Sequence, residues 1–200
     1  LLSAELPLPK NILVHGMITS GGVKMSKSIG NVIDPMEVIN EFGVEALRYY
    51  VAREISTFED GDMTLERFKE AYNANLANGL GNLVARIMKM ASSNLDGAVN
   101  VGDTKVPEKY TELLEAFEIQ KTTNFVWDYI QDLDKTIQEK EPFKLIKQDR
   151  EAGIKIIKEL VERLAQIARM LIPFMPSTSE AIILAIKENI MPITLFPRKD

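Results

Sequence analysis

The first part of the chain has a short cluster of apolar and β-branched residues. Residues 12–19, ILVHGMIT, form this run between Pro9 and the pair Gly21-Gly22. An apolar run of this length, bounded by turn-forming residues, is typical of a buried strand. A strand is therefore predicted over residues 12–19. It leads into a loop over residues 21–35 with the sequence GGVKMSKSIGNVIDP.

Two short helices and a turn are predicted after this loop. Asp34 and Pro35 are residue types favoured at the N-cap and at the first helical position, so a helix should begin at Pro35 and end at Gly43. A second helix is expected over residues 44–54. Residues 58–62, FEDGD, then indicate a turn or a short edge segment.

From Thr64 onward, apolar residues recur every three or four positions, which is the period of one face of a helix. This stripe predicts one long amphipathic helix that ends near residues 92–94, Ser-Ser-Asn. Its apolar members are Leu65, Phe68, Tyr72, Leu76, Leu80, Leu83, Ile87 and Met90.

Further helices are predicted beyond this one. A loop over residues 96–107, rich in Gly, Asp and Pro, leads to a helix over residues 108–139, which the pair Thr122-Thr123 could break. Pro142 then interrupts the helical pattern.

The last helical segments complete the pattern. An apolar stripe from Ile154 to Leu171 predicts a helix that ends before Pro173, and Ser177 with Glu180 matches the capping box of a last short helix. Successive amphipathic helices with short connections predict an antiparallel helix bundle.

Composition and charge limit the chemistry that these elements can carry. The 200 residues include 29 acidic and 24 basic side chains, and the formal charge is −5. A nucleic-acid partner would therefore have to bind a local basic surface. The chain has no cysteine, and His15 is its single histidine. This composition excludes disulfides and thiolate or histidine-rich metal sites, so we expect no metal ligands.

The sequence also carries expectations about location. No apolar run approaches the roughly 20 residues of a membrane span, and the start, LLSAELPLPKN, lacks the pattern of a signal peptide. We therefore expect a cytoplasmic protein without membrane contact. The chain begins without Met, inside what reads as continuing structure, so we expect it to be part of a longer polypeptide.

The loop over residues 21–35 is a candidate phosphate-binding site. Lys24 and Lys27 could place ammonium groups where negative charge builds up on a polyphosphate. Ser26, Ser28 and nearby amides could donate hydrogen bonds to phosphate oxygens, and Met25 could anchor the loop. An ordinary solvated Lys/Ser/Gly loop explains the composition equally well.

A polar stripe on the long helix is a second candidate site. Asn75, Asn78, Asn82, Arg86 and Lys89 are three or four residues apart, and residues 71–95 include no acidic residue. Asn and Arg can form paired hydrogen bonds with exposed base edges of single-stranded RNA. Taken alone, the stripe is better explained as an ordinary polar helix face.

Several segments resemble one family. KMSKS and GNVIDP, within residues 24–35, resemble the second signature loop of class I aminoacyl-tRNA synthetases. Segments on both sides of this loop resemble, in order, the methionyl-tRNA synthetase family, so the likeness covers nearly all 200 residues. These segments are LPLPKNILVHGMIT, FGVEALRYYVARE, FEDGDMTLERF, NANLANGLGNLVARI, EPFKLIK, IPFMPSTSEAI and LFPR.

The resemblance implies a mainly α fold in two parts. Residues 1–62 would be the end of a Rossmann-type catalytic domain, with a short strand, the KMSKS loop, connecting helices and a segment that contacts the tRNA stem. Residues 63–200 would be an antiparallel α-helical anticodon-binding domain. The HIGH-type motif and the zinc-bearing insertion of the family are absent here. We therefore expect the N-terminal half with the methionine pocket to lie outside this chain, which alone would be inactive.

The family resemblance also implies an activity, methionine–tRNA ligation. Methionine and ATP, with Mg²⁺, would give methionyl-adenylate, and the methionine would then be transferred to tRNA(Met). Lys27, supported by Lys24, would act on the phosphates. The loop residues that would bind ATP are Lys24, Met25, Ser26, Lys27 and Ser28.

In the helical region the resemblance implies that Asn82, Arg86 and Phe143 bind the anticodon. Phe143 stands in the context Glu141-Pro142-Phe143, where the family usually has tryptophan, so it retains a stacking face but lacks the indole N–H. Base–aromatic stacking contributes about 1–3 kcal/mol per base. Trp127, the single tryptophan, is expected in the core.

Other readings remain open. The chain could belong to another class I synthetase, of leucyl, valyl or isoleucyl type, or be a noncatalytic helical tRNA-binding module in which the loop is a relic. His15 is better explained as a core histidine than as part of an adenine site. Arg48 and Arg53 could contact phosphates or form ion pairs.

Overall fold

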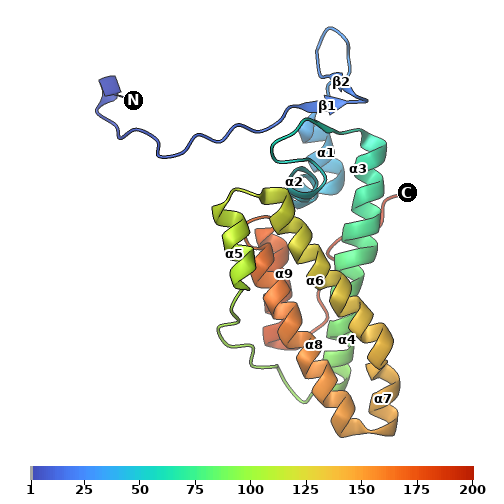
Figure 1. Cartoon of the computed structure of the whole chain (residues 1–200). Helices are drawn as coiled ribbons and strands as arrows, with labels where there is room; N and C mark the ends of the chain where they lie inside the picture. Colours follow the sequence, from blue (N-terminus) through green and yellow to red (C-terminus); the bar gives the residue numbers. More distant parts are fainter. Residues whose placement is uncertain (1) are drawn as a thin grey trace.

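The computed structural model describes residues 2–200. A short 3-10 helix, η1 (Leu2–Ala4), is followed by an extended segment, residues 6–17, that has neither helix nor strand. This segment extends away from the rest of the molecule, which is an elongated array of helices with a small sheet at one end (Figure 1). The protein is mainly α, as predicted from the sequence.

The sheet has three very short strands in the order β2-β1-β3. β1 (Ile18–Ser20) pairs antiparallel with β2 (Val23–Lys24) and parallel with β3 (Gly61–Asp62). Gly21 and Gly22, with φ of 64° and 75°, form the two-residue turn between β1 and β2. Positive φ at both positions matches the right-handed twist of a hairpin and favours glycine.

The strand predicted over residues 12–19 is mostly wrong. Only Ile18 and Thr19 of that run belong to β1, and no described segment pairs with residues 12–16. Ile12 and Val14 are 82% and 76% exposed. β-branched side chains favour strands, but β2 and β3 are too short to provide a ladder for these residues.

The two short helices after the loop are confirmed. Asp34 Oδ1 accepts a hydrogen bond from Met36 N at 2.8 Å, and α1 (Pro35–Phe42) begins with its proline. Gly43, with φ of 92°, separates α1 from α2 (Val44–Arg53).

The predicted long helix is present as one continuous rod, residues 65–94 (Figure 1). It consists of α3 (Leu65–Ala71), a π-helical stretch η2 (Tyr72–Gly81) and α4 (Asn82–Asn94). The π stretch was not predicted, because a spacing of three or four fits either helix type at this length. Most of the apolar stripe is buried in the core, namely Phe68, Tyr72, Leu76, Leu80, Leu83 and Ile87.

Five further helices follow in the described chain. They are α5 (Glu108–Glu115), α6 (Ile119–Lys140), α7 (Pro142–Gln148), α8 (Arg150–Leu171) and α9 (Pro176–Glu188). α8 packs against α4, α6, α7 and α9 and is the centre of the array. α6 and α8 run in opposite directions and are joined through α7 (Figure 1). At this turn, a Cβ on Gly153 would lie 2.6 Å from Ile146 Cα, so only glycine fits.

The helix predicted over residues 108–139 breaks earlier than expected. Phe117, with φ of 59°, separates α5 from α6. Thr122 and Thr123 are buried inside α6, where their hydroxyl groups donate to Glu118 O and Ala52 O. Thr123 therefore joins α6 to α2, whereas the Thr122 hydroxyl bonds within its own helix.

Trp127 lies in the core, as predicted, with its ring centroid 4.8 Å from that of Tyr49. The Arg53 guanidinium lies over the indole at 5.1 Å and pairs with Glu54. Arg48 donates to the carbonyl groups of Pro173 and Phe174, just after α8. Both arginines are thus used in contacts that join α2 to its surroundings.

The capping box predicted from Ser177 and Glu180 is wrong. α9 begins at Pro176, and no side chain at its N-cap accepts a hydrogen bond. Glu45 of α2 provides the acceptors instead. Its carboxylate accepts hydrogen bonds from Ser177 N at 2.5 Å, from Thr178 N at 2.8 Å and from the Thr178 hydroxyl. A carboxylate at a helix N-terminus satisfies free N–H groups and interacts favourably with the helix dipole.

We predict that Glu45→Ala lowers the free energy of unfolding by about 1–2 kcal/mol, the usual cost of losing an N-cap. Urea denaturation at neutral pH would measure the change. Glu41→Ala is the matched control, because the Glu41 side chain is exposed and forms no hydrogen bond or ion pair with residues 2–200. Equal effects of the two substitutions would contradict the capping role of Glu45.

Candidate functional site

The loop between β2 and α1 is closed by its own hydrogen bonds. Asn31 Oδ1 accepts from Ser26 N at 2.8 Å, and Asn31 Nδ2 donates to the carbonyl groups of Val23 and Lys24. Ser26 O accepts from the amides of Ile29 and Gly30. One asparagine side chain thus joins both ends of the loop, which fixes the path of the residues between them.

The predicted phosphate-binding residues lie on this closed loop. Lys24, Lys27 and Ser28 are exposed, whereas Met25 and Ser26 are partly buried. The hydroxyl groups of Ser26 and Ser28 lie 2.8 Å apart. Within residues 2–200, no carboxylate pairs with the ammonium group of Lys24 or Lys27. Both positive charges therefore face solvent, where an anionic ligand can reach them.

Asp62 fastens the hairpin that carries the loop. Its Oδ1 accepts from Gly22 N at 2.8 Å and from Thr19 Oγ1 at 3.0 Å, and its Oδ2 pairs with Arg67 at 2.9 Å. The hydrogen bond from Gly22 N is the main cause that holds the pKa of Asp62 below its ordinary value, with smaller contributions from Thr19 and Arg67. Asp62 thus links the β1–β2 turn to the start of the rod.

The second candidate site lies near the other end of the rod. Arg86 of α4 and Phe143 of α7 line one hollow of about 320 Å³, together with Lys89, Met90, Ser93, Asn94 and Ile137. Phe143 is 47% exposed, and Lys144 Nζ lies 5.9 Å from its ring centroid. Lys144 also pairs with Glu141 at 2.6 Å, so its charge is partly neutralised within the chain. An exposed aromatic ring is suited to stacking an RNA base.

Asn82 lies in a neighbouring hollow. Together with Asn78 and Ala85 it faces residues 191–196 of the C-terminal segment across a space of about 420 Å³. Asn82 and Arg86 are successive members of the polar stripe, but they border different hollows. The structure therefore brings Arg86 and Phe143 together and places Asn82 one helical turn away.

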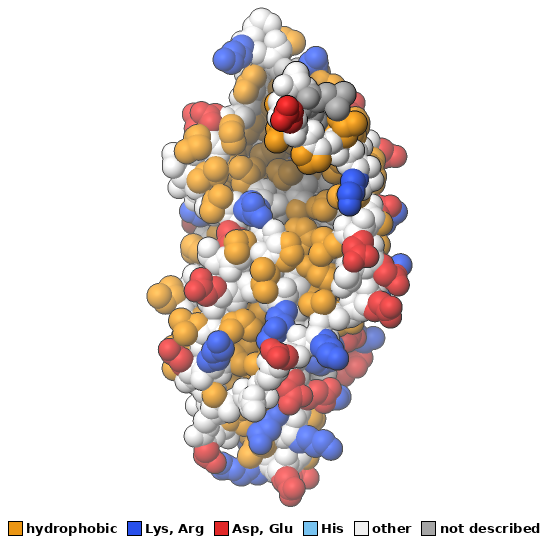
Figure 2. All heavy atoms as spheres, turned by 90° about the vertical axis from the view of Figure 1, so that its left-hand side faces the viewer, with side chains coloured by type: hydrophobic (Ala, Val, Ile, Leu, Met, Phe, Trp, Pro, Cys, Tyr) orange, Lys and Arg blue, Asp and Glu red, His pale blue; other side chains and the backbone are white. Residues whose placement is uncertain are grey.

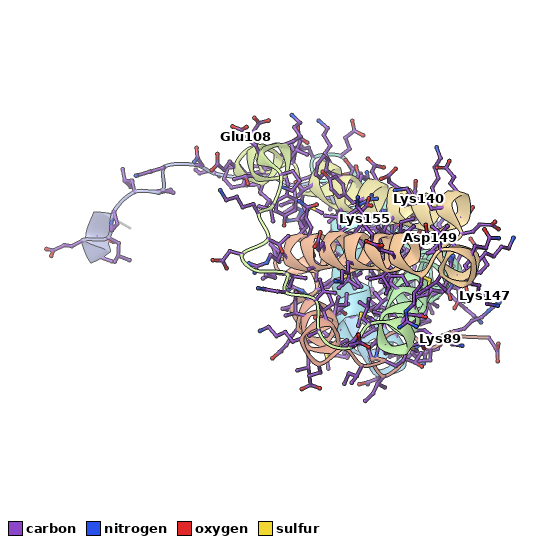
Figure 3. The ribbon with its side chains drawn as sticks, turned by 90° about the horizontal axis from the view of Figure 1, so that it is seen from below. Lys89, Glu108, Lys140, Lys147, Asp149 and Lys155 are labelled. Carbon is purple, nitrogen blue, oxygen red and sulfur yellow. The ribbon has the colours of Figure 1, made fainter. Side chains whose placement is uncertain are left out.

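Basic residues surround this end of the molecule. Lys89 on α4 and Lys147 on α7 are both exposed, and both are seen when the molecule is viewed from below (Figure 3). Lys140 pairs with Glu159 at 3.5 Å, so part of this charge is neutralised within the chain.

Comparison with known proteins identifies the family. The family model described as "tRNA synthetases class I (M)" matches residues 1–88. A methionine–tRNA ligase from Clostridium acetobutylicum is 38% identical, with 91% of this chain and 31% of that protein covered. One from Thermotoga maritima is 33% identical, with the same coverage. The chain belongs to the class I methionyl-tRNA synthetase family.

Solved structures of the methionyl-tRNA synthetase family share the fold. The apo form of the Mycobacterium tuberculosis enzyme has a TM-score of 0.79 and 24% identity, covering 100% of this chain and 46% of that one. The same enzyme in complex with methionyl-adenylate has a TM-score of 0.75 and 28% identity, covering 100% and 45%. The chain spans about a third of the length of the curated methionyl-tRNA synthetases named above.

The expectation that His15 is a core residue is wrong. His15 is exposed, and its Nδ1 lies 2.7 Å from Gly16 O. It borders an apolar hollow of about 510 Å³ between the extended segment and α2, with Leu13, Val51 and Phe174 among the other lining residues. This recess, with hydrophobic side chains around it, lies below the N-terminal segment in Figure 2.

Two carboxylates that fix the sites were not recognised from the sequence. The sequence indicated only a turn or short edge segment at Asp62. An acidic residue in an edge strand beside a Gly-Gly turn is a signal that its carboxylate accepts hydrogen bonds from the turn. Asp134 of α6 pairs with Arg86, and its position 48 residues away gave no sequence signal.

Two absences complete the description of residues 2–200. None of the helices in this range is both long and apolar enough to cross a membrane. No cluster of three or more His, Cys, Asp or Glu side chains in the same range could hold a metal ion.

We predict that the Asp62 anchor is intact at neutral pH and is released in acid. Because the folded-state pKa is below the ordinary value of 3.8, the stabilisation is complete above that value and is lost as pH falls through the lowered pKa. The measurement is a carboxyl ¹³C titration of Asp62, combined with exchange of the Gly22 amide relative to its intrinsic rate.

The control is Asp62→Asn, which keeps an oxygen acceptor but does not titrate. Protection of the Gly22 amide in this variant should show no step in the same pH range. A titration midpoint at or above 3.8 for Asp62 in the unmodified chain would contradict the anchor.

Proposed function

We propose that this chain is the ATP-facing and tRNA-binding portion of a methionine–tRNA ligase. Residues 1–62 would carry the phosphate-binding loop, and residues 63–200 would form the anticodon-binding domain. The relation to methionine–tRNA ligases over 91% of the chain is the observation that carries this proposal. The substrates are methionine, ATP with Mg²⁺ and tRNA(Met), and the setting is the cytoplasm, where tRNA is used.

The proposed chemistry begins with attack of the methionine carboxylate on the α-phosphorus of ATP. A new bond forms between this carboxylate and the α-phosphorus, and the bond from that phosphorus to pyrophosphate breaks. Negative charge builds up on the leaving pyrophosphate, and a nearby ammonium group lowers the energy of that state. Lys27 supplies this charge, with Lys24 supporting it.

The loop supports this role because it is both closed and charged. Asn31 and the turn at Ser26 restrict the backbone, while Lys24 and Lys27 remain without an internal ion pair among residues 2–200. Restricting the loop before ATP binds reduces the entropy lost on binding. Met25 and Ser26 are partly buried and hold the loop base, and Ser28 completes the proposed ATP-binding set.

In the proposed tRNA-binding domain, the hollow with Arg86 and Phe143 receives an anticodon base. The Phe143 ring would stack on the base and Arg86 would donate hydrogen bonds to its edge. Asn82, one turn earlier on the rod, would contact a neighbouring base through its amide. Exposed bases of a single-stranded loop are suited to this combination of stacking and edge recognition.

We predict that Lys27→Ala, in a polypeptide of full family length that carries these residues, slows adenylate formation by roughly a hundred- to a thousand-fold. The KM for methionine should change little, because the lysine acts on the phosphates. ATP–pyrophosphate exchange measures both quantities. Lys10→Ala, which alters an exposed lysine in the extended segment, is the control. Equal losses in rate and in methionine binding would overturn the role of Lys27.

We further predict that this chain binds an anticodon stem-loop with CAU more tightly than loops with single-base changes. Asn82→Ala and Arg86→Ala should remove most of this preference, and Phe143→Ala should weaken binding by about 1–3 kcal/mol. Fluorescence anisotropy over a range of salt concentrations measures these effects.

Lys89→Ala is the comparison for this experiment. It should weaken binding to all the stem-loops alike and reduce the slope of log affinity against log salt by about 1, as expected for a phosphate contact. If the unmodified chain binds every loop equally and loses binding steeply with salt, only phosphate attraction is present and the proposed anticodon reading is wrong.

A further inference from the structure

The contact between Arg86 and Asp134 joins two elements that the sequence keeps far apart. Arg86 Nη1 of α4 donates to Asp134 Oδ1 of α6, across 48 residues of sequence. The two side chains are 35% and 34% exposed, so the pair is not part of the core. Arg86 borders the hollow with Phe143, and Asp134 borders a neighbouring hollow with Asn78. An ion pair this exposed contributes little to folding stability. Its position beside the proposed anticodon hollow suggests another use.

The carboxylate of Asp134 is itself held in place. Its second oxygen, Oδ2, accepts from Gln138 Nε2 at 2.5 Å, one turn along the same helix. Both oxygens are therefore engaged, one by the arginine and one by the glutamine. A carboxylate fixed in this way can set the direction in which the guanidinium lies.

The guanidinium keeps other donors free. Within residues 2–200, Nη1 is the one guanidinium nitrogen of Arg86 that forms a hydrogen bond. Nε and Nη2 therefore remain able to donate to a ligand. Because arginine has a rigid planar fork, holding one nitrogen restricts the positions from which the others can donate.

We propose that Asp134 is a positioning residue that holds Arg86 as a base reader and keeps it from acting as a phosphate-binding charge. This inference rests on the proposed anticodon function. Holding the side chain before RNA binds reduces the freedom that is lost on binding. Pairing its charge with a carboxylate also reduces its attraction for phosphate groups at any position along an RNA strand. Affinity then depends on the base in the hollow rather than on charge alone.

The test compares Asp134→Asn with Asp132→Asn in the 200-residue chain. Asp132 lies two residues earlier on α6 and pairs with Arg163 of α8, so its substitution removes the same charge and also breaks an aspartate–arginine pair, but it does not touch Arg86. Both variants are titrated with the CAU stem-loop and with single-base changes at several salt concentrations. Thermal unfolding of each variant shows whether it remains folded.

For Asp134→Asn, we expect the preference for CAU to fall roughly three- to tenfold, the effect of releasing one ordered side chain. The slope of log affinity against log salt should also steepen by up to about 0.9, as the released Arg86 neutralises a phosphate. Asp132→Asn should leave the preference unchanged. In an Arg86→Ala background, Asp134→Asn should have no further effect on the preference, because Asp134 acts through Arg86.

Three results would overturn the inference. One is an unchanged preference in Asp134→Asn, and another is an equal loss in Asp132→Asn, which would indicate a general effect of charge. The third is a loss that persists in the Arg86→Ala background. If the unmodified chain has no preference for CAU, the proposed anticodon function fails, and this inference fails with it. If the unmodified chain prefers CAU and one of the three results above is found, only this inference fails.

Discussion

Burial of one face of the rod, residues 65–94, is the constraint on which the rest of the structure depends. Leu76, Leu80, Leu83 and Ile87 are almost fully buried along this face. Each such side chain contributes about 1.5–3 kcal/mol relative to an exposed one. Because α8 packs against α4 and also against α6, α7 and α9, the position of the rod determines where the remaining helices can lie.

The rod also sets the distance between the two candidate sites. Arg67, at its start, pairs with the Asp62 anchor of the loop-bearing hairpin, and Arg86 lies 19 residues further along. In a straight α-helix this separation would be about 28 Å, and the π-helical stretch, which has more residues per turn, makes it somewhat shorter. The loop and the hollow are therefore at opposite ends of one stiff element (Figure 1). Such spacing suits a long ligand better than a small one.

The sequence was most informative where structure depends on local chemistry. The apolar stripe of the rod, the Asp34 N-cap and the Gly43 helix end all depend on residues within a few positions of one another, and all are present. The KMSKS-type loop was also found, because its composition is local.

Features that depend on distant partners could not be predicted in this way. The N-cap of α9 is provided by Glu45, 132 residues earlier, and Arg86 is paired with Asp134 of another helix. The apolar residues 12–14 have the composition of a strand, but no described segment pairs with them. The period of apolar residues in the sequence shows which face of a helix is buried, but it does not show which distant residues contact that face.

The end of the chain returns to the start of the rod. Asn73 exchanges two hydrogen bonds with the backbone of Lys199, and Tyr72 donates to Pro197 O. Phe196 is buried and packs edge-on against the Tyr72 ring. These contacts join residues about 125 positions apart, so they have high contact order. During synthesis the rod and the inner helices can form early, but the start of the rod stays uncovered until residues 196–199 have left the ribosome.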